Sequence, residues 1–82
     1  MLLAYTDLDG TTHRTRAKIT TDHSASSYGV PVIVLPDGGL IDATSWALLA
    51  YHVVKATPAE RAMLARWIEQ VNFLLRGGDG VP

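Results

Sequence analysis

The chain has 82 residues, which is enough for one domain and leaves no room for a separate catalytic domain. It contains no cysteine, and this excludes disulfides, thiol nucleophiles and cysteine-only zinc sites. Hydrophobic residues make up 48% of it, charged residues 18%, and the formal net charge is -1. This balance argues against disorder and against a general attraction to nucleic acid or anionic membranes.

The amino-terminal residues do not match a targeting signal. Residues 1–5 lack a positively charged start, and Asp7 interrupts the apolar run before it reaches the about 7–15 residues of a signal-peptide core. No stretch approaches the roughly 20 apolar residues that span a bilayer. We therefore expect a cytoplasmic protein with no membrane partner and a single domain over residues 1–82.

A β-hairpin is predicted at the start of the chain. Residues 2–6 are compatible with a strand and run into Asp9-Gly10, a dipeptide typical of tight turns. Residues 11–20 would form the returning strand. Because side chains alternate between the two faces of a strand, one face of this strand is basic and carries Arg14, Arg16 and Lys18.

The middle of the chain predicts a surface loop followed by two further strands. Residues 21–29 are polar and end at a glycine, so we expect a loop there. The β-branched run over 30–35 is expected at the centre of the sheet. Residues 36–39 then contain a second Asp-Gly turn, after which residues 40–41 can pair back as a short strand.

The next segment has two possible interpretations, and both remain open. Asp42 can cap a helix, and the apolar spacing behind it predicts a core-facing stripe over about 43–54. A competing interpretation ends the helix earlier and makes residues 52–56 a short strand, because Val53 and Val54 are β-branched.

The last helix has the clearest boundary. Thr57 is typical of an N-cap, Pro58 of the first helical position and Glu60 of a capping box, so a helix is predicted over about 58–76. Two glycines end it, and a short flexible tail is expected from about residue 77. Its core-facing stripe comprises Leu64, Trp67, Ile68, Val71, Leu74 and Leu75.

Together these segments predict a two-layer α+β fold. A small antiparallel sheet of three to four strands over about residues 2–41 would be covered by one or two helices over about 43–54 and 58–76. The long helix would supply much of the core.

One short motif resembles a catalytic one. The segment Thr6-Asp7-Leu8-Asp9-Gly10-Thr11-Thr12 is similar to the first motif of haloacid-dehalogenase-type phosphatases. That resemblance covers some seven residues and implies a nucleophile at Asp7, a general acid/base at Asp9 and a magnesium ion. The same residues predict a tight hairpin turn, and the chain is too short for the doubly wound sheet of that family, so we favour the turn.

No other group of residues predicts catalysis. Asp22, His23 and Ser24 are consecutive, and consecutive side chains cannot form the hydrogen-bonded relay of a hydrolase triad. The histidines, at positions 13, 23 and 52, do not have the spacing of a zinc site. We therefore expect no enzyme, no catalytic residue, no metal site and no cofactor.

The function predicted by elimination is that of a small protein-binding or regulatory module with an unidentified partner. Arg14, Arg16 and Lys18 are the candidate contact residues for a partner, although an ordinary solvated strand face explains them as well. Nucleic-acid binding through the same three residues is an alternative that we do not favour. Phe73 lies off the core stripe, and together with Trp67 it predicts the interface of a homodimer.

Overall fold

The computed structural model describes residues 1–77, so the predicted tail lies, apart from Gly77, outside the described residues. In chain order the elements are β1 (Leu2–Thr6), β2 (Thr12–Arg16), β3 (Lys18–Thr20), β4 (Val32–Val34), β5 (Leu40–Ile41), α1 (Ala43–Leu49), β6 (His52–Lys55) and α2 (Pro58–Leu75). Within residues 1–77 no helix is long and apolar enough to cross a membrane.

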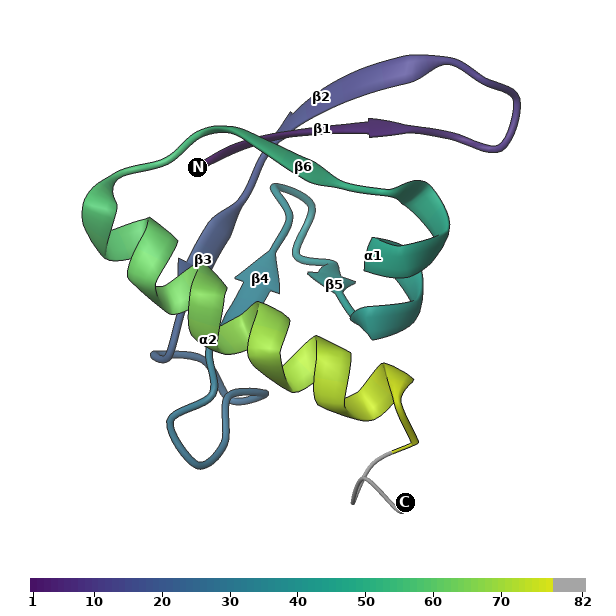
Figure 1. The fold of residues 1–82 in the computed structure, drawn as a ribbon. Coiled ribbons are helices and arrows are strands. Elements are labelled where there is room, and N and C mark those ends of the chain that lie inside the picture. Colours follow the sequence, from purple (N-terminus) through teal and green to yellow (C-terminus); the bar gives the residue numbers. More distant parts are fainter. Residues whose placement is uncertain (78–82) are drawn as a thin grey trace.

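The strands form two antiparallel three-stranded sheets, with the orders β2-β1-β6 and β3-β4-β5. The predicted α+β class is confirmed, but six strands in two sheets replace the expected single sheet. The difference arises at Ala17, where the predicted strand over 11–20 divides into β2 and β3. The backbone of Ala17 still pairs with Met1, donating to its carbonyl at 2.9 Å. Figure 1 shows β2 and β3 as consecutive parts of one bent ribbon.

Both predicted Asp-Gly turns are present. Gly10 and Gly38 have φ angles of 90° and 89°, a left-handed conformation that glycine adopts without steric cost. The strand between the loop and the second turn is β4, which lies at the centre of its sheet as expected. Ile33 in β4 is completely buried, and Pro31 just before the strand is also buried.

The segment after β5 divides into a short helix and a strand. Asp42 accepts a hydrogen bond from the Ser45 amide at 2.8 Å, which starts α1 as predicted. Ala50 follows α1 in a left-handed conformation, with φ of 47°. The prediction of a helix to residue 54 is wrong, and the strand interpretation is confirmed, because β6 pairs with β1 and places Val53 opposite Leu3.

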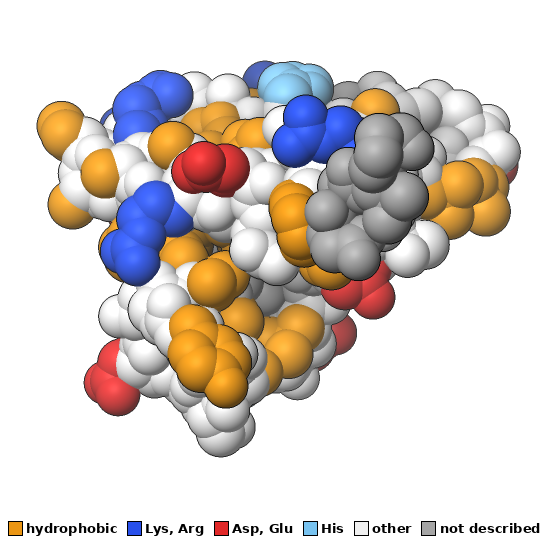
Figure 2. All heavy atoms as spheres, turned by 60° about the horizontal axis from the view of Figure 1, so that its bottom comes forward, with side chains coloured by type: hydrophobic (Ala, Val, Ile, Leu, Met, Phe, Trp, Pro, Cys, Tyr) orange, Lys and Arg blue, Asp and Glu red, His pale blue; other side chains and the backbone are white. Residues whose placement is uncertain are grey.

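The long helix α2 begins with the predicted capping box. Thr57 Oγ1 accepts from the Glu60 amide at 3.1 Å, and Glu60 Oε1 accepts from the Thr57 amide at 2.9 Å. The predicted stripe is wrong at its end, where Leu74 and Leu75 are 54% and 55% exposed, because the last turn extends past the core. Figure 2 shows the face of the molecule that carries α2, where hydrophobic side chains lie exposed among charged ones. The buried residues of α2 are Leu64, Trp67 and Val71.

The core lies between the two sheets and α2. It combines branched side chains of four strands and the small side chain of the β2–β3 junction with three residues of the helix: Leu3, Ala17, Ile19, Ile33, Ile41, Leu64, Trp67 and Val71. A chain of aromatic contacts, with ring centroids 4.8 to 5.5 Å apart, then connects the first hairpin to α2. Its members are, in order, His13, Tyr5, Tyr51, Trp46 and Trp67.

We predict that Trp67→Ala unfolds most of the protein at ambient temperature. Trp67 is 6% exposed and packs edge-on against Trp46 with ring centroids 5.0 Å apart. Truncating a buried tryptophan costs about 3–5 kcal/mol, which is comparable to the stability of a small domain. Thermal unfolding followed by circular dichroism checks this, with Leu75→Ala as the exposed control on the same helix. Cooperative melting of Trp67→Ala near the parent temperature would contradict the prediction.

Candidate functional site

One face of the β2-β1-β6 sheet gathers basic side chains from both of its edge strands. Alternation along β2 exposes Arg14 and Arg16. The register places Leu2 between Arg16 and Lys55 in one row across the sheet. In Figure 1 both helices lie below this sheet. Ala4 is at the centre of the neighbouring row, and the four basic residues of the two rows, which we call the basic face, are Arg14, Arg16, His52 and Lys55.

No carboxylate within residues 1–77 forms an ion pair with the arginines or the lysine of the basic face. The ion pairs in this part of the chain join the amino-terminal ammonium of Met1 to Glu60 at 2.8 Å and His13 to Asp7 at 2.5 Å. The positive charges of the basic face therefore remain available to an external anion, although the chain as a whole has a net charge of -1.

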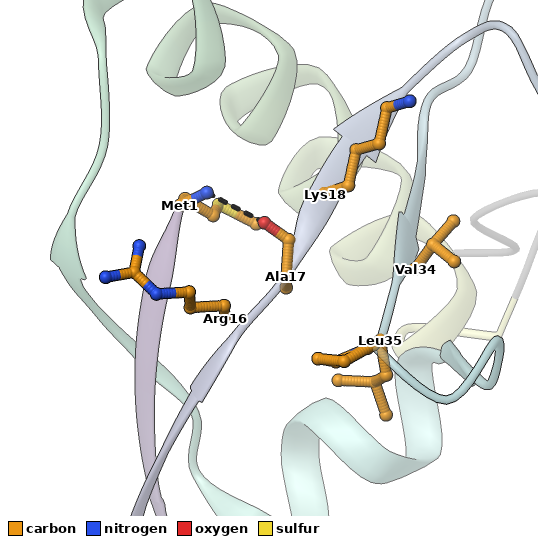
Figure 3. Close-up of a pocket in the computed structure, with 7 residues that line it drawn as sticks. Met1, Arg16, Ala17, Lys18, Val34 and Leu35 are labelled. Carbon is orange, nitrogen blue, oxygen red and sulfur yellow. Dashed lines mark hydrogen bonds between the residues drawn. The ribbon is translucent and has the colours of Figure 1, made fainter.

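The third predicted contact residue, Lys18, lies on the neighbouring sheet. It pairs with Val34 in β4 rather than with β1. Arg16 and Lys18 nevertheless line the same open cleft, which has a volume of about 420 Å³. Residues 34–36 form its opposite wall. Figure 3 shows Arg16 and Lys18 on either side of Ala17, with Leu35 opposite.

A second cleft, of about 280 Å³, joins the basic face to the start of α2. Arg16 and Lys55 line it together with Glu60. The Glu60 carboxylate does not neutralise them, because its oxygens are bound to the Met1 ammonium and the Thr57 amide. These two hydrogen bonds lower the pKa of Glu60 to about 2.

The hairpin turn uses the carboxylate that the phosphatase resemblance would make a nucleophile. Asp7 Oδ1 accepts from the amides of Asp9 and Thr11, each at 3.1 Å, and Oδ2 lies 2.5 Å from His13 Nε2. Contacts with Asp9 and His13 lower the pKa of Asp7 to about 2. Asp9 Oδ1 accepts from the Thr11 amide at 2.9 Å. Both carboxylates thus stabilise the turn.

The magnesium ion implied by that resemblance does not fit these residues. Across the described part of the chain, no three His, Asp or Glu side chains gather as a metal site. The histidines lie on separate elements, and the polar loop binds its own backbone: His23 Nδ1 accepts from the Ala25 amide, and Thr20 Oγ1 accepts from the Asp22 amide.

The polar loop presents an aromatic side chain at its tip. Tyr28 is completely exposed and has a positive φ of 53°, which is unusual for a residue with a bulky side chain. The turn is tied to α2, because Arg66 donates a hydrogen bond to the carbonyl of Gly29. The loop is therefore anchored to α2 and exposes one aromatic ring to solvent.

The two residues predicted for a dimer interface have different environments. Trp67 is part of the core and keeps only 6% of its surface exposed. Phe73 is 40% exposed and lies on the last turns of α2, near the exposed Leu74 and Leu75. Only Phe73 offers surface to a second molecule.

Sequence reasoning missed His52 and Lys55 as members of the basic face. Both lie on β6, and only the pairing of β6 with β1 brings them beside Arg14 and Arg16. Simple alternation along residues 52–55 would place these two side chains on opposite faces, and they share a face because the register of the β1–β6 pairing shifts between Leu2 and Leu3, an irregularity that the sequence does not signal.

The chain matches no protein-family model, no curated protein and no solved structure.

We predict that the free energy of unfolding decreases as the pH is lowered below about 4.5, and that Glu60→Gln weakens this dependence. Folding lowers the pKa of Glu60 from 4.5 to about 2, so its charge stabilises the fold above about pH 4.5, and this stabilisation is lost as the pH falls toward 2. Glutamine keeps the capping acceptor and removes the charge. Denaturant unfolding at several pH values measures the slope.

The matched control is Glu69→Gln, an exposed residue on α2 with no ion pair among the described residues. It should keep the parent slope. An unchanged slope in Glu60→Gln would show that the Glu60 ion pair with Met1 does not stabilise the fold.

Proposed function

We propose that the protein is a small intracellular binding module that contacts an acidic protein partner through the basic face and Lys18. The observation that supports this most is the unneutralised charge of Arg14, Arg16 and Lys55 on one exposed sheet face. Opposite charges across an interface accelerate encounter and fix the orientation of the partner. Clefts of about 420 and 280 Å³ beside Arg16 could accommodate side chains of the partner.

Nucleic acid is the second candidate, because phosphates would meet the same charges. Proteins that bind single strands combine such charges with aromatic rings on which bases stack. The aromatic residue of β1, Tyr5, instead stacks on His13 and contacts Tyr51 on the core side of the sheet. This arrangement favours a protein partner over a nucleic acid.

We predict that the double variant Arg14→Glu/Arg16→Glu binds a glutamate-rich peptide at least about tenfold more weakly than the parent at low salt, because attraction becomes repulsion. Fluorescence anisotropy with a labelled peptide measures this. The control is the single variant Arg76→Glu, at the exposed end of α2, which should bind like the parent.

Two outcomes would contradict the proposed partner class. One is equal peptide binding by the parent and the double variant. The other is binding of mixed-sequence single-stranded DNA or RNA, lost in the double variant, by a parent protein that does not bind the peptide.

We also propose that the module is a homodimer, which would supplement its thin core. Support comes from the end of α2, where Phe73, Leu74 and Leu75 are 40%, 54% and 55% exposed. Several large hydrophobic side chains exposed at one end of a helix are typical of contact surfaces.

For the homodimer we expect a solution mass of twice the 8.9 kDa chain, measured by light scattering at micromolar concentration. Phe73→Glu should shift the mass toward that of one chain, because it would bury a charge in the interface. Leu8→Glu is the control, since Leu8 is 81% exposed at the hairpin tip. A parent protein with the mass of one chain would contradict the dimer.

A further inference from the structure

The outer edge of β2 carries backbone groups that have no backbone partner among the described residues. Ala17 exchanges hydrogen bonds with Met1 across the β1 side, donating to the Met1 carbonyl and accepting from its ammonium. Backbone groups alternate between the two edges of a strand. Those of Thr15 therefore face β1, and those of Arg14 and Arg16 face outward, where β2 has no neighbouring strand.

The residues with outward backbone groups are also the residues with basic side chains. Arg14 and Arg16 each offer an amide donor and a carbonyl acceptor at the edge, and each carries its guanidinium on the basic face. The one side-chain contact of these groups is weak, since the Thr15 hydroxyl lies 3.4 Å from the Arg16 carbonyl. The outer edge of β2 therefore offers positive charge and unpaired backbone groups at the same two residues.

The outer edge of β2 is open because β4 pairs with β3 and does not extend along β2. Along β3, which continues β2, β4 fills this edge and pairs Val34 with Lys18. Extending that register would place Pro36 opposite Arg16, but proline has no amide hydrogen to donate. Leu35 instead donates to the Gly39 carbonyl at 2.7 Å and starts the turn. Figure 3 shows the two segments diverging beyond Ala17 and Leu35.

We propose that an acidic protein segment binds as an added antiparallel strand on the open edge of β2, with carboxylates at alternate positions opposite Arg14 and Arg16. This inference rests on the proposed function and specifies its partner. An antiparallel segment would continue the line of β4. Its side chains opposite the two arginines would share their face, about 7 Å apart, which is the spacing of alternate residues in a strand.

A second copy of the chain is the wrong occupant for this edge. Antiparallel pairing of β2 with β2 would place arginines of one copy against arginines of the other. Like charges directly opposite one another are destabilising, and basic edge strands are a known means of preventing such self-pairing. An alternating acidic segment removes that repulsion and satisfies the open backbone groups.

The first test compares two eight-residue peptides of equal composition. One alternates glutamate and threonine, and the other has four consecutive glutamates followed by four threonines. If an added strand forms, only the alternating peptide can place all its carboxylates on one face, and it should bind at least about fivefold more tightly. Equal affinities would overturn the proposed strand geometry.

The second test removes backbone donors from the alternating peptide. N-methylation of its glutamates deletes the amides that would donate to Arg14 and Arg16, whereas N-methylation of its threonines deletes amides that would face solvent. The first should weaken binding by about tenfold or more and the second far less, since each lost hydrogen bond is worth about a factor of five to ten. Equal effects of the two modifications would overturn strand addition.

The failures of the two proposals can be told apart. If Arg14→Glu/Arg16→Glu abolishes binding but both methylated peptides bind alike, the acidic partner class survives and the added strand is wrong. If the charge-reversed variant binds every peptide like the parent, the proposed function is wrong and the strand proposal falls with it.

Discussion

The junction at Ala17 is the constraint on which the rest of the structure depends. Ala17 is 7% exposed, is part of the core and is hydrogen-bonded in both directions to Met1. The residues before it pair with β1, and the residues after it pair with β4. Because the chain passes from one sheet to the other at this point, two short sheets enclose one core. The same change of partner leaves the outer edge of β2 open.

The distribution of charge follows from how the acidic residues are used. Asp7 and Asp37 accept hydrogen bonds from turn amides, Asp42 caps α1, and Glu60 completes the cap of α2. These carboxylates are occupied by the turns and helix starts that they stabilise, and even Glu60, which lines a cleft with Arg16 and Lys55, binds the Met1 ammonium and the Thr57 amide instead. A net charge near zero therefore conceals a sheet face with unneutralised arginine and lysine side chains.

Sequence reasoning succeeded where the determining contacts are local. The Asp-Gly turns and the capping box of Thr57 and Glu60 depend on residues within four positions of one another. It failed where distant pairing decides: the division of a strand at Ala17 and the extended state of residues 52–55 both depend on contacts with the first strand. Alternation predicted the exposure of Arg14 and Arg16, but it could not reveal that Lys55 lies beside them.

The central claim is that Arg14 and Arg16 present free backbone groups at an open, positively charged edge. Residue-resolved amide hydrogen exchange of the unbound protein, followed by NMR, tests it most directly. The amides of His13 and Thr15, which face β1, should be protected, whereas those of Arg14 and Arg16 should exchange much faster. Equal and strong protection of all four amides would contradict it, because the outer edge of β2 would then already be occupied.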